Sequence, residues 1–135
     1  MVNYIAIVVA SIISFLFGML WYSPLLFGNV WIKLMGFNKK DMEKAKKKGM
    51  GKTLLLSFIS TLVTAYVLSY FLVVLRYSSA VDGALFGFMI WLGFLATTML
   101  GGVLWEGKSY SLYFLNITYH LANLIIMGAI LGAWV

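Results

Sequence analysis

Four long apolar stretches constrain this chain more than any other feature of its sequence. In a chain of 135 residues they run at about 3–22, 52–75, 80–105 and 110–134. About 20 helical residues, each rising about 1.5 Å, cross a hydrocarbon core of about 30 Å. The chain is 63% hydrophobic and 10% charged, whereas a soluble domain is about 45–50% apolar and about 25% charged. We therefore predict an all-α integral membrane protein, a bundle of four transmembrane helices forming one domain over residues 1–135.

The first stretch is expected to remain in the mature protein. No basic residues precede it, and it is longer than the apolar core of a signal peptide, which has about 7–15 residues. Ser23-Pro24 should end it, because the residue before a proline is pushed out of the helical region. Proline suits the first turn of a new helix, which Ser23 would cap.

Residues 24–49 are predicted to lie outside the hydrocarbon core. Residues 24–35 have an apolar and a polar side, which predicts a short amphipathic helix in the membrane interface. Aromatic and basic residues of the type that anchor a protein in the interface gather here: Trp21, Tyr22, Ser23, Pro24, Trp31 and Lys33. Gly36 should stop this helix, Asn38 and Asp41 should cap a basic helical segment, and Gly49 should terminate it.

The distribution of lysines predicts the orientation. Eight of the ten basic residues fall between Lys33 and Lys52, whereas the second loop carries only Arg76 and the third only Lys108. Because cytoplasmic loops carry the excess of positive charge, the lysine-rich loop should be cytoplasmic and both termini outside. The same loop is expected to bind anionic lipid headgroups. We expect the lipid bilayer as a partner and no nucleic acid.

Small residues recur at the spacing of helix-packing faces. Membrane helices associate through close backbone approach and interhelical hydrogen bonds. Stripes along the first two spans predict their mutual contact, and glycine pairs occur on the third and fourth. The members are Ala6, Ala10, Ser14 and Gly18; Ser57, Thr61, Ala65 and Ser69; Gly83 and Gly87; Gly128 and Gly132. These faces exceed what a minimal four-helix bundle needs, which predicts a homo-oligomer.

One stripe of polar side chains is expected inside the membrane. His120 is the only ionisable residue near the middle of a span, and Tyr113, Asn116 and Asn123 share its helical face. Thr64, Thr97 and Thr98 are candidate partners from neighbouring helices. The stripe is either a hydrogen-bond clamp between helices or a functional path in which His120 relays protons or contacts a substrate.

The acidic residues have structural interpretations. Ser79 and Asp82 form a pattern typical of a helix start. Glu106, at the cytoplasmic end of the third span, is expected to pair with Lys108 or the basic loop, or to be solvated. The chain has no cysteine, one histidine and four acids, and these form no catalytic triad and no cluster of metal ligands. We expect no enzymatic activity, no cofactor and no metal site.

Two sequence runs are similar to a known family. The run "WYSPLLFGNVWIKLMG", followed by a lysine-rich loop, and the run "LWEGKSYSLYFLNITYHLANLIIMGAILGAW" resemble the bacterial and archaeal membrane family catalogued as domain of unknown function 1761. The resemblance covers nearly the whole chain, and Trp21 to Gly28 is its most specific element. It implies a four-helix protein of a prokaryotic cell membrane and brings no reaction or site residues with it.

Two functional hypotheses remain open. The first is a non-enzymatic membrane protein that acts through helix packing and oligomeric assembly. The alternative is a minimal oligomeric transporter or channel, with a polar path around His120.

Overall fold

The computed structural model describes residues 2–47 and 49–134, and the side chains of all of these except Met42, Ala45 and Lys46. Lys48 and the side chain of Lys46, both in the predicted basic segment, lie outside this description. Every regular element of the described residues is a helix, which confirms the predicted all-helical class. The order is α1 (Tyr4–Trp21), α2 (Gly28–Met35), α3 (Lys39–Lys47), α4 (Met50–Val74), α5 (Ala80–Ile90), the π-helix η1 (Trp91–Ala96), α6 (Thr97–Glu106) and α7 (Tyr110–Ala133).

Four helical stretches in the described chain are long and apolar enough to cross a membrane. They are α1, α4, the continuous stretch from α5 through η1 to α6, and α7. Their ends lie within about two residues of the predicted ones. The predicted cap of the third stretch is also present, because the Ser79 hydroxyl accepts a hydrogen bond from the Asp82 N–H at 3.1 Å.

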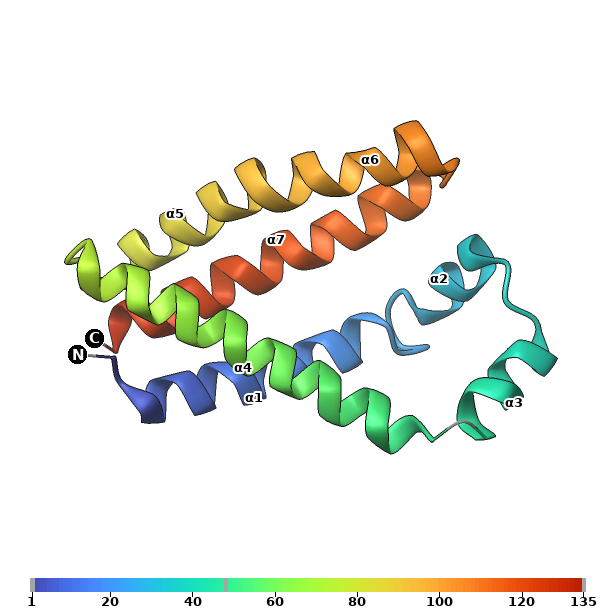
Figure 1. The fold of residues 1–135 in the computed structure, drawn as a ribbon, viewed down its shortest axis with the longest axis horizontal. Coiled ribbons are helices and arrows are strands. Elements are labelled where there is room, and N and C mark those ends of the chain that lie inside the picture. The colour runs from blue at the N-terminus through green and yellow to red at the C-terminus, as the bar shows by residue number, and fades with distance from the viewer. Residues whose placement is uncertain (1, 48, 135) are drawn as a thin grey trace.

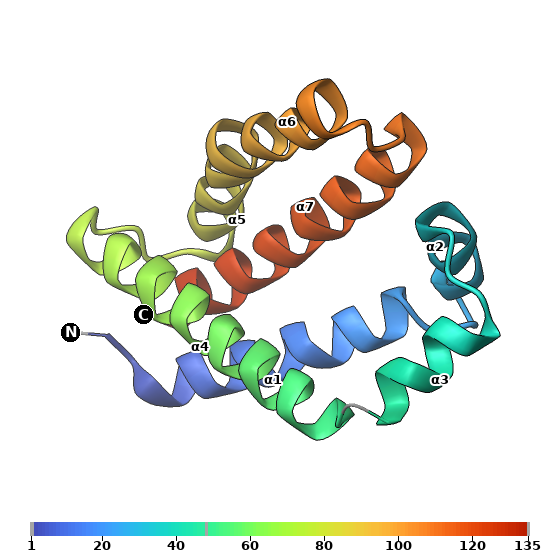
Figure 2. The same cartoon turned by 45° about the vertical axis from the view of Figure 1, so that its right-hand side comes forward.

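The long helices pack around α7, which lies between α1 and the α5–α6 stretch, while α4 crosses over α1 (Figure 1). The most extensive interface joins α7 to α5. The two chain ends lie together, where Asn3 Nδ2 donates to the Trp134 carbonyl at 3.1 Å. At the opposite end lie α2, α3 and the turn between α6 and α7 (Figures 1 and 2). We call this end, residues 22–47, 49–52 and 106–110, the lysine-rich end.

The buried core lies where α1, α4 and α7 meet, toward the chain ends. Ala6 and Ala10 of α1 pack in one cluster with Ala65 of α4 and with leucines and a methionine of α4 and α7. The rest of the α1 stripe, Ser14 and Gly18, faces α7 instead. The predicted α1–α4 contact through small residues is therefore wrong for this half of the stripe, since α4 diverges from α1 and Ser57 is exposed.

Glycines bring α5 and α7 into direct backbone contact. A Cβ added at Gly83 would lie 1.8 Å from the Gly128 carbonyl oxygen, and one at Gly132 would lie 2.3 Å from the Ser79 carbonyl oxygen. At Gly87 it would meet the Leu124 carbonyl oxygen at 2.3 Å. Both glycine pairs are thus occupied within one chain. These two glycine faces therefore serve packing within the chain, which is the interpretation that each face favours by itself, and homo-oligomerisation stays a prediction.

The third long stretch contains a π-helix, η1, of which the apolar pattern gives no sign. In a π-helix the hydrogen bonds join residues five apart instead of four, and such segments often occur at functional sites. Both ends of η1 are tied to α7. Trp91 Nε1 donates to the Ile117 carbonyl at 2.7 Å, and the Tyr113 hydroxyl donates to the Ala96 carbonyl at 2.6 Å.

The predicted start of the short helix after α1 is wrong. Residues 22–27 form turns, and α2 begins at Gly28. Ser23 does not cap α2, because its hydroxyl donates back to the Leu20 carbonyl at 2.7 Å. Its carbonyl accepts from the Leu26 and Gly28 N–H groups at 3.1 and 2.8 Å. The turn is so tight that a Cβ at Gly28 would lie 2.5 Å from the Tyr22 carbonyl oxygen.

The predicted stop at Gly36 and the predicted cap at Asn38 and Asp41 are confirmed, whereas the predicted end of the basic helix at Gly49 stays a prediction, because Lys48 lies outside the described residues. Gly36 ends α2 in the left-handed conformation, with φ 73°. Asn38 and Asp41 cap each other reciprocally, the Asp41 N–H donating to Asn38 Oδ1 at 2.9 Å and the Asn38 N–H to Asp41 Oδ2 at 3.1 Å. Gly49, also left-handed, directly precedes α4.

Candidate functional site

Three members of the predicted polar stripe of α7 form hydrogen bonds to neighbouring elements. The Ser14 hydroxyl of α1 donates to Asn123 Oδ1 at 2.5 Å, with both residues buried. The Tyr22 hydroxyl donates to Asn116 Oδ1 at 2.8 Å, and Tyr113 holds Ala96 as described above. The stripe therefore contains the interhelical hydrogen bonds expected of a clamp.

His120 differs from its three neighbours on the stripe. Its ring is half-buried beside the Tyr119 ring, with centroids 5.0 Å apart. Among the described residues it makes no hydrogen bond. The sequence thus places His120 on the polar face, while the interhelical bonds are made by the residues around it.

Two of the three threonines predicted as partners of this stripe, Thr64 and Thr97, bond within their own helical stretch instead. The Thr64 hydroxyl donates to the Ser60 carbonyl at 3.1 Å and the Thr97 hydroxyl to the Gly93 carbonyl at 2.8 Å, each within its own helix. A threonine in a helix can satisfy its hydroxyl on the carbonyl four residues earlier, and the two side chains do so here.

Aromatic rings connect the Trp21–Gly28 turn to both α2 and α7. The Trp21 ring lies 4.5 Å from the Phe27 ring and 6.1 Å from the Tyr119 ring, measured between centroids. The Tyr22 ring lies 5.3 Å from Tyr119 and 5.8 Å from Trp31 of α2, both edge-on. Such edge-to-face pairs stabilise a contact beyond simple burial. The turn therefore fixes α2 against α7, while Pro24 and Lys33 are exposed.

A cavity of about 470 Å³ lies between α2, α6 and the start of α7, at the lysine-rich end. Trp31 and Met35 of α2 line one side, and the other lining residues come from α6, the turn after it and α7; Figure 2 shows α2 at the same end of the molecule as the beginning of α7. Its lining residues are Trp31, Met35, Thr98, Met99, Gly102, Val103, Glu106, Lys108, Leu112, Tyr113 and Asn116. The cavity is thus bounded by residues up to 85 positions apart in the sequence.

The cavity combines apolar walls with polar groups in a definite order along α7. Glu106 and Lys108 form an ion pair at the α6–α7 turn, 3.2 Å between Nζ and Oε2, and their side chains are 64% and 60% exposed. Asn116 lies six residues beyond the start of α7, about 9 Å along the helix axis. The rest of the lining is mainly apolar, with methionine, valine and leucine side chains. The arrangement fits a molecule with one polar and one apolar part.

The cavity unites predicted site residues that the sequence placed in separate features. Trp31 was expected as an interfacial anchor, Glu106 as a helix-end acid, and Asn116 as part of the polar stripe. Thr98 and Tyr113 also line it, whereas His120 and Asn123 do not. The expected pairing of Glu106 with Lys108 is present.

Sequence reasoning missed several residues of this site. Lys108 was considered only for orientation and as a partner of Glu106, and Met35, Met99 and Leu112 were not singled out. The spacing of Trp31 and Met35, four apart on α2, was the available signal, because it places both on one helical face. No three His, Cys, Asp or Glu side chains lie together in the described part of the chain.

Fold and cavity together define a class: an all-helical protein with four helices long and apolar enough to cross a membrane, and an amphipathic cavity at the lysine-rich end. The model of the family described as "Protein of unknown function (DUF1761)" matches residues 5–132. The chain therefore belongs to this family, which confirms the resemblance drawn from its sequence. No curated protein and no solved structure matches the chain.

Proposed function

We propose that this protein is a multi-pass integral membrane protein that binds an amphiphilic molecule, without converting it chemically, in the cavity at its lysine-rich end. The observation that carries the proposal is the cavity of about 470 Å³ with apolar walls and a charged edge. Cavities that bind small molecules have volumes of about 300–1,000 Å³, with mainly apolar linings and few polar groups.

The position of the cavity supports an amphiphilic ligand. The ion pair at the α6–α7 turn lies at the end of two candidate membrane spans, where headgroups would lie. The apolar walls continue from there along α6 and α7, toward the hydrocarbon. An amphiphile in a membrane leaflet has the same order of polar and apolar parts. It can therefore enter the cavity while its polar part stays near headgroups and water and its apolar part stays away from water.

Filling the cavity tests this function. Val103→Trp adds bulk at a lining position, whereas Val81→Trp adds the same bulk at a position that is 68% exposed on α5. We expect native mass spectrometry of detergent-purified protein to show one lipid or lipid-like molecule retained by wild type and Val81→Trp, and lost from Val103→Trp. Retention by no variant, or equal retention by both tryptophan variants, would refute the proposal.

We further propose that the lysine-rich end faces the cytoplasm and both termini face outside a cell membrane. Residues 24–52 contain eight lysines, and the other loops carry one basic residue each. Because the chain has no cysteine, Arg76→Cys and Lys44→Cys give clean single sites. An impermeant maleimide added to intact cells should label the first and spare the second, and the reverse pattern would contradict this orientation.

Homo-oligomerisation is a second proposal, supported by the first half of α4. Leu54, Leu55 and Leu56 are 40–60% exposed there, and Ser57 and Ser60 are exposed beside them. Hydroxyls on an apolar helix favour a helical partner over lipid. We expect Ser57→Cys to cross-link two copies in the membrane and the control Phe94→Cys, exposed on η1, to remain monomeric; equal cross-linking would refute this interface.

The transport alternative has less support. A polar path around His120 needs free polar side chains, but Tyr113, Asn116 and Asn123 each accept or donate a hydrogen bond to another element. Three of the four side chains thus act as helix contacts.

A further inference from the structure

We infer that the cavity selects an anionic phospholipid, with the Lys108 ammonium binding the phosphate and the Asn116 amide donating to an ester oxygen deeper in the cavity. This inference rests on the proposed ligand-binding function and names the class of ligand.

The first step is the orientation of Asn116. Its Oδ1 accepts a hydrogen bond from the Tyr22 hydroxyl at 2.8 Å. An asparagine amide has two N–H donors on its nitrogen, and Nδ2 of Asn116 has no acceptor among the described residues. Asn116 lines the cavity, so its amide Nδ2 can donate a hydrogen bond to a ligand there. The matching ligand group is an oxygen acceptor.

The second step is the ammonium at the edge of the cavity. The stem of Lys108 lies along the cavity wall, since a Cβ added at Gly102 would be 3.3 Å from Lys108 Cδ. Its Nζ carries three donors and uses the Glu106 carboxylate as one partner. Because that pair is largely exposed, the carboxylate holds the ammonium weakly. The ammonium can therefore bind a phosphate oxygen at the same time.

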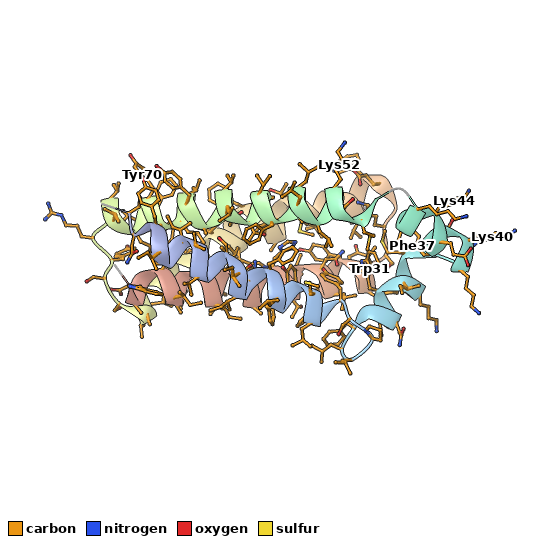
Figure 3. The ribbon with its side chains drawn as sticks, turned by 90° about the horizontal axis from the view of Figure 1, so that it is seen from below. Trp31, Phe37, Lys40, Lys44, Lys52 and Tyr70 are labelled. Atoms are coloured by element: carbon orange, nitrogen blue, oxygen red, sulfur yellow. The ribbon has the colours of Figure 1, made fainter. Side chains whose placement is uncertain are left out.

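The third step is the charge around the cavity. Residues 24–52 contain eight lysines and two acids, and Figure 3 shows Lys40 and Lys44 projecting from this end of the molecule, with Tyr70 near the opposite end. Basic residues near an anionic surface attract it. The field concentrates lipids with a net negative charge and gives a zwitterionic lipid no such advantage.

The fourth step separates a lipid from a soluble phosphate. Met35, Met99, Val103 and Leu112 form the apolar walls. Methionine side chains are flexible and adapt to irregular apolar partners such as acyl chains. A free phosphate or glycerol phosphate would leave these walls without a partner, so we assign the cavity to the lipid itself.

The test compares two lipids that share phosphate, esters and acyl chains. Purified protein in detergent is incubated with equal amounts of phosphatidylglycerol and phosphatidylcholine, and native mass spectrometry counts the retained lipid of each kind. Both phosphates can contact Lys108, but the choline ammonium of phosphatidylcholine compensates the charge of its phosphate and is repelled by the lysines of this end. We therefore expect wild type to retain phosphatidylglycerol about fivefold over phosphatidylcholine, the effect of about one basic residue on a lipid of net negative charge. Excess glycerol phosphate should displace neither lipid, and displacement would overturn the assignment to a lipid.

Two variants locate the selectivity. Lys108→Met should remove most of the preference while both lipids still bind, and the matched control Lys33→Met, an exposed lysine of the same end outside the cavity, should keep it. Asn116→Ser should weaken both lipids several-fold with the preference unchanged. An equal loss of preference in Lys108→Met and Lys33→Met would assign selectivity to the general field and overturn the inference.

Failure of this inference differs from failure of the proposed function. If wild type retains both lipids equally and Val103→Trp retains neither, the cavity binds amphiphiles but does not select anionic ones. If wild type retains neither lipid but still carries another lipid-like molecule that Val103→Trp loses, this inference fails and the proposed function stands; if wild type carries no such molecule at all, both are refuted.

Discussion

Replacing Gly83 with alanine should separate the two most closely packed helices of the protein. The new Cβ would lie 1.8 Å from the Gly128 carbonyl oxygen and 2.7 Å from its carbonyl carbon. Because ordinary contacts begin near 3.4 Å, α5 and α7 must move apart by roughly 1.5 Å. Overpacking costs about 1–3 kcal/mol in a well-packed core. Here the obstacle is backbone and no side chain can rotate away, so we expect a loss of about 3 kcal/mol.

The measurement is the free energy of unfolding in mixed detergent micelles, titrated with a denaturing detergent. Gly101→Ala is the matched control, because it makes the same change in the same helical stretch and its Cβ would meet nothing within 4 Å. Alanine is the better helix former by up to about 1 kcal/mol, so the control should equal or exceed the wild-type stability. Equal stability of the two alanine variants would refute the close backbone contact as a source of stability.

Three further predictions concern polar contacts. A double-mutant cycle with Ser14→Ala and Asn123→Leu should give a coupling energy of about 0.6 kcal/mol and at most about 1.7 kcal/mol, the range for hydrogen bonds between membrane helices; a zero coupling would contradict the clamp. Tyr22→Phe should destabilise the protein by about 1 kcal/mol and speed maleimide labelling of a cysteine placed at Met35, and an unchanged rate would show that this bond does not hold α2. Glu106→Gln should change the stability by less than about 1 kcal/mol, because its ion pair is exposed, and a larger loss would mean that the pair is shielded from water.

The features readable from the sequence are those set by neighbouring residues. The four long stretches follow from unbroken apolar runs, and the caps at Asn38 and Ser79 follow from side chains three residues apart. The start of α2 could not be read in this way. Proline permits a helix start, but the Ser23 hydroxyl donates to the Leu20 carbonyl at the end of α1 and so does not cap a new helix. The Ser23 carbonyl accepts from the Gly28 N–H, which closes a turn up to the first residue of α2.

The cavity could not be predicted because its walls come from three separate segments. Each of Trp31, Glu106 and Asn116 was noticed for a local reason, as an anchor, a helix-end acid and a polar position on a span. Their meeting depends on α2 folding back against α7. That path is set by the Tyr22–Asn116 bond and by the contacts of the Trp21 and Tyr22 rings with the Tyr119 ring, which join residues far apart in the chain.

The π-helix η1 changes which residues of the third long stretch face α7. With 3.6 residues per turn, a regular helix that directs Gly83 and Gly87 toward α7 would bring Phe94 and Trp105 to the same side. Both are instead among the most exposed side chains, at 68% and 88%. Beyond η1 the inward side has rotated by one residue, so that Ala96 and then Gly102 and Glu106 lie toward α7 and the cavity. Deleting a single residue within 91–96 would therefore let the stretch run as a regular α-helix in which Gly102 and Glu106 still face the cavity, whereas loss of the π turn without a deletion would turn Trp105 inward and carry Glu106 away from it.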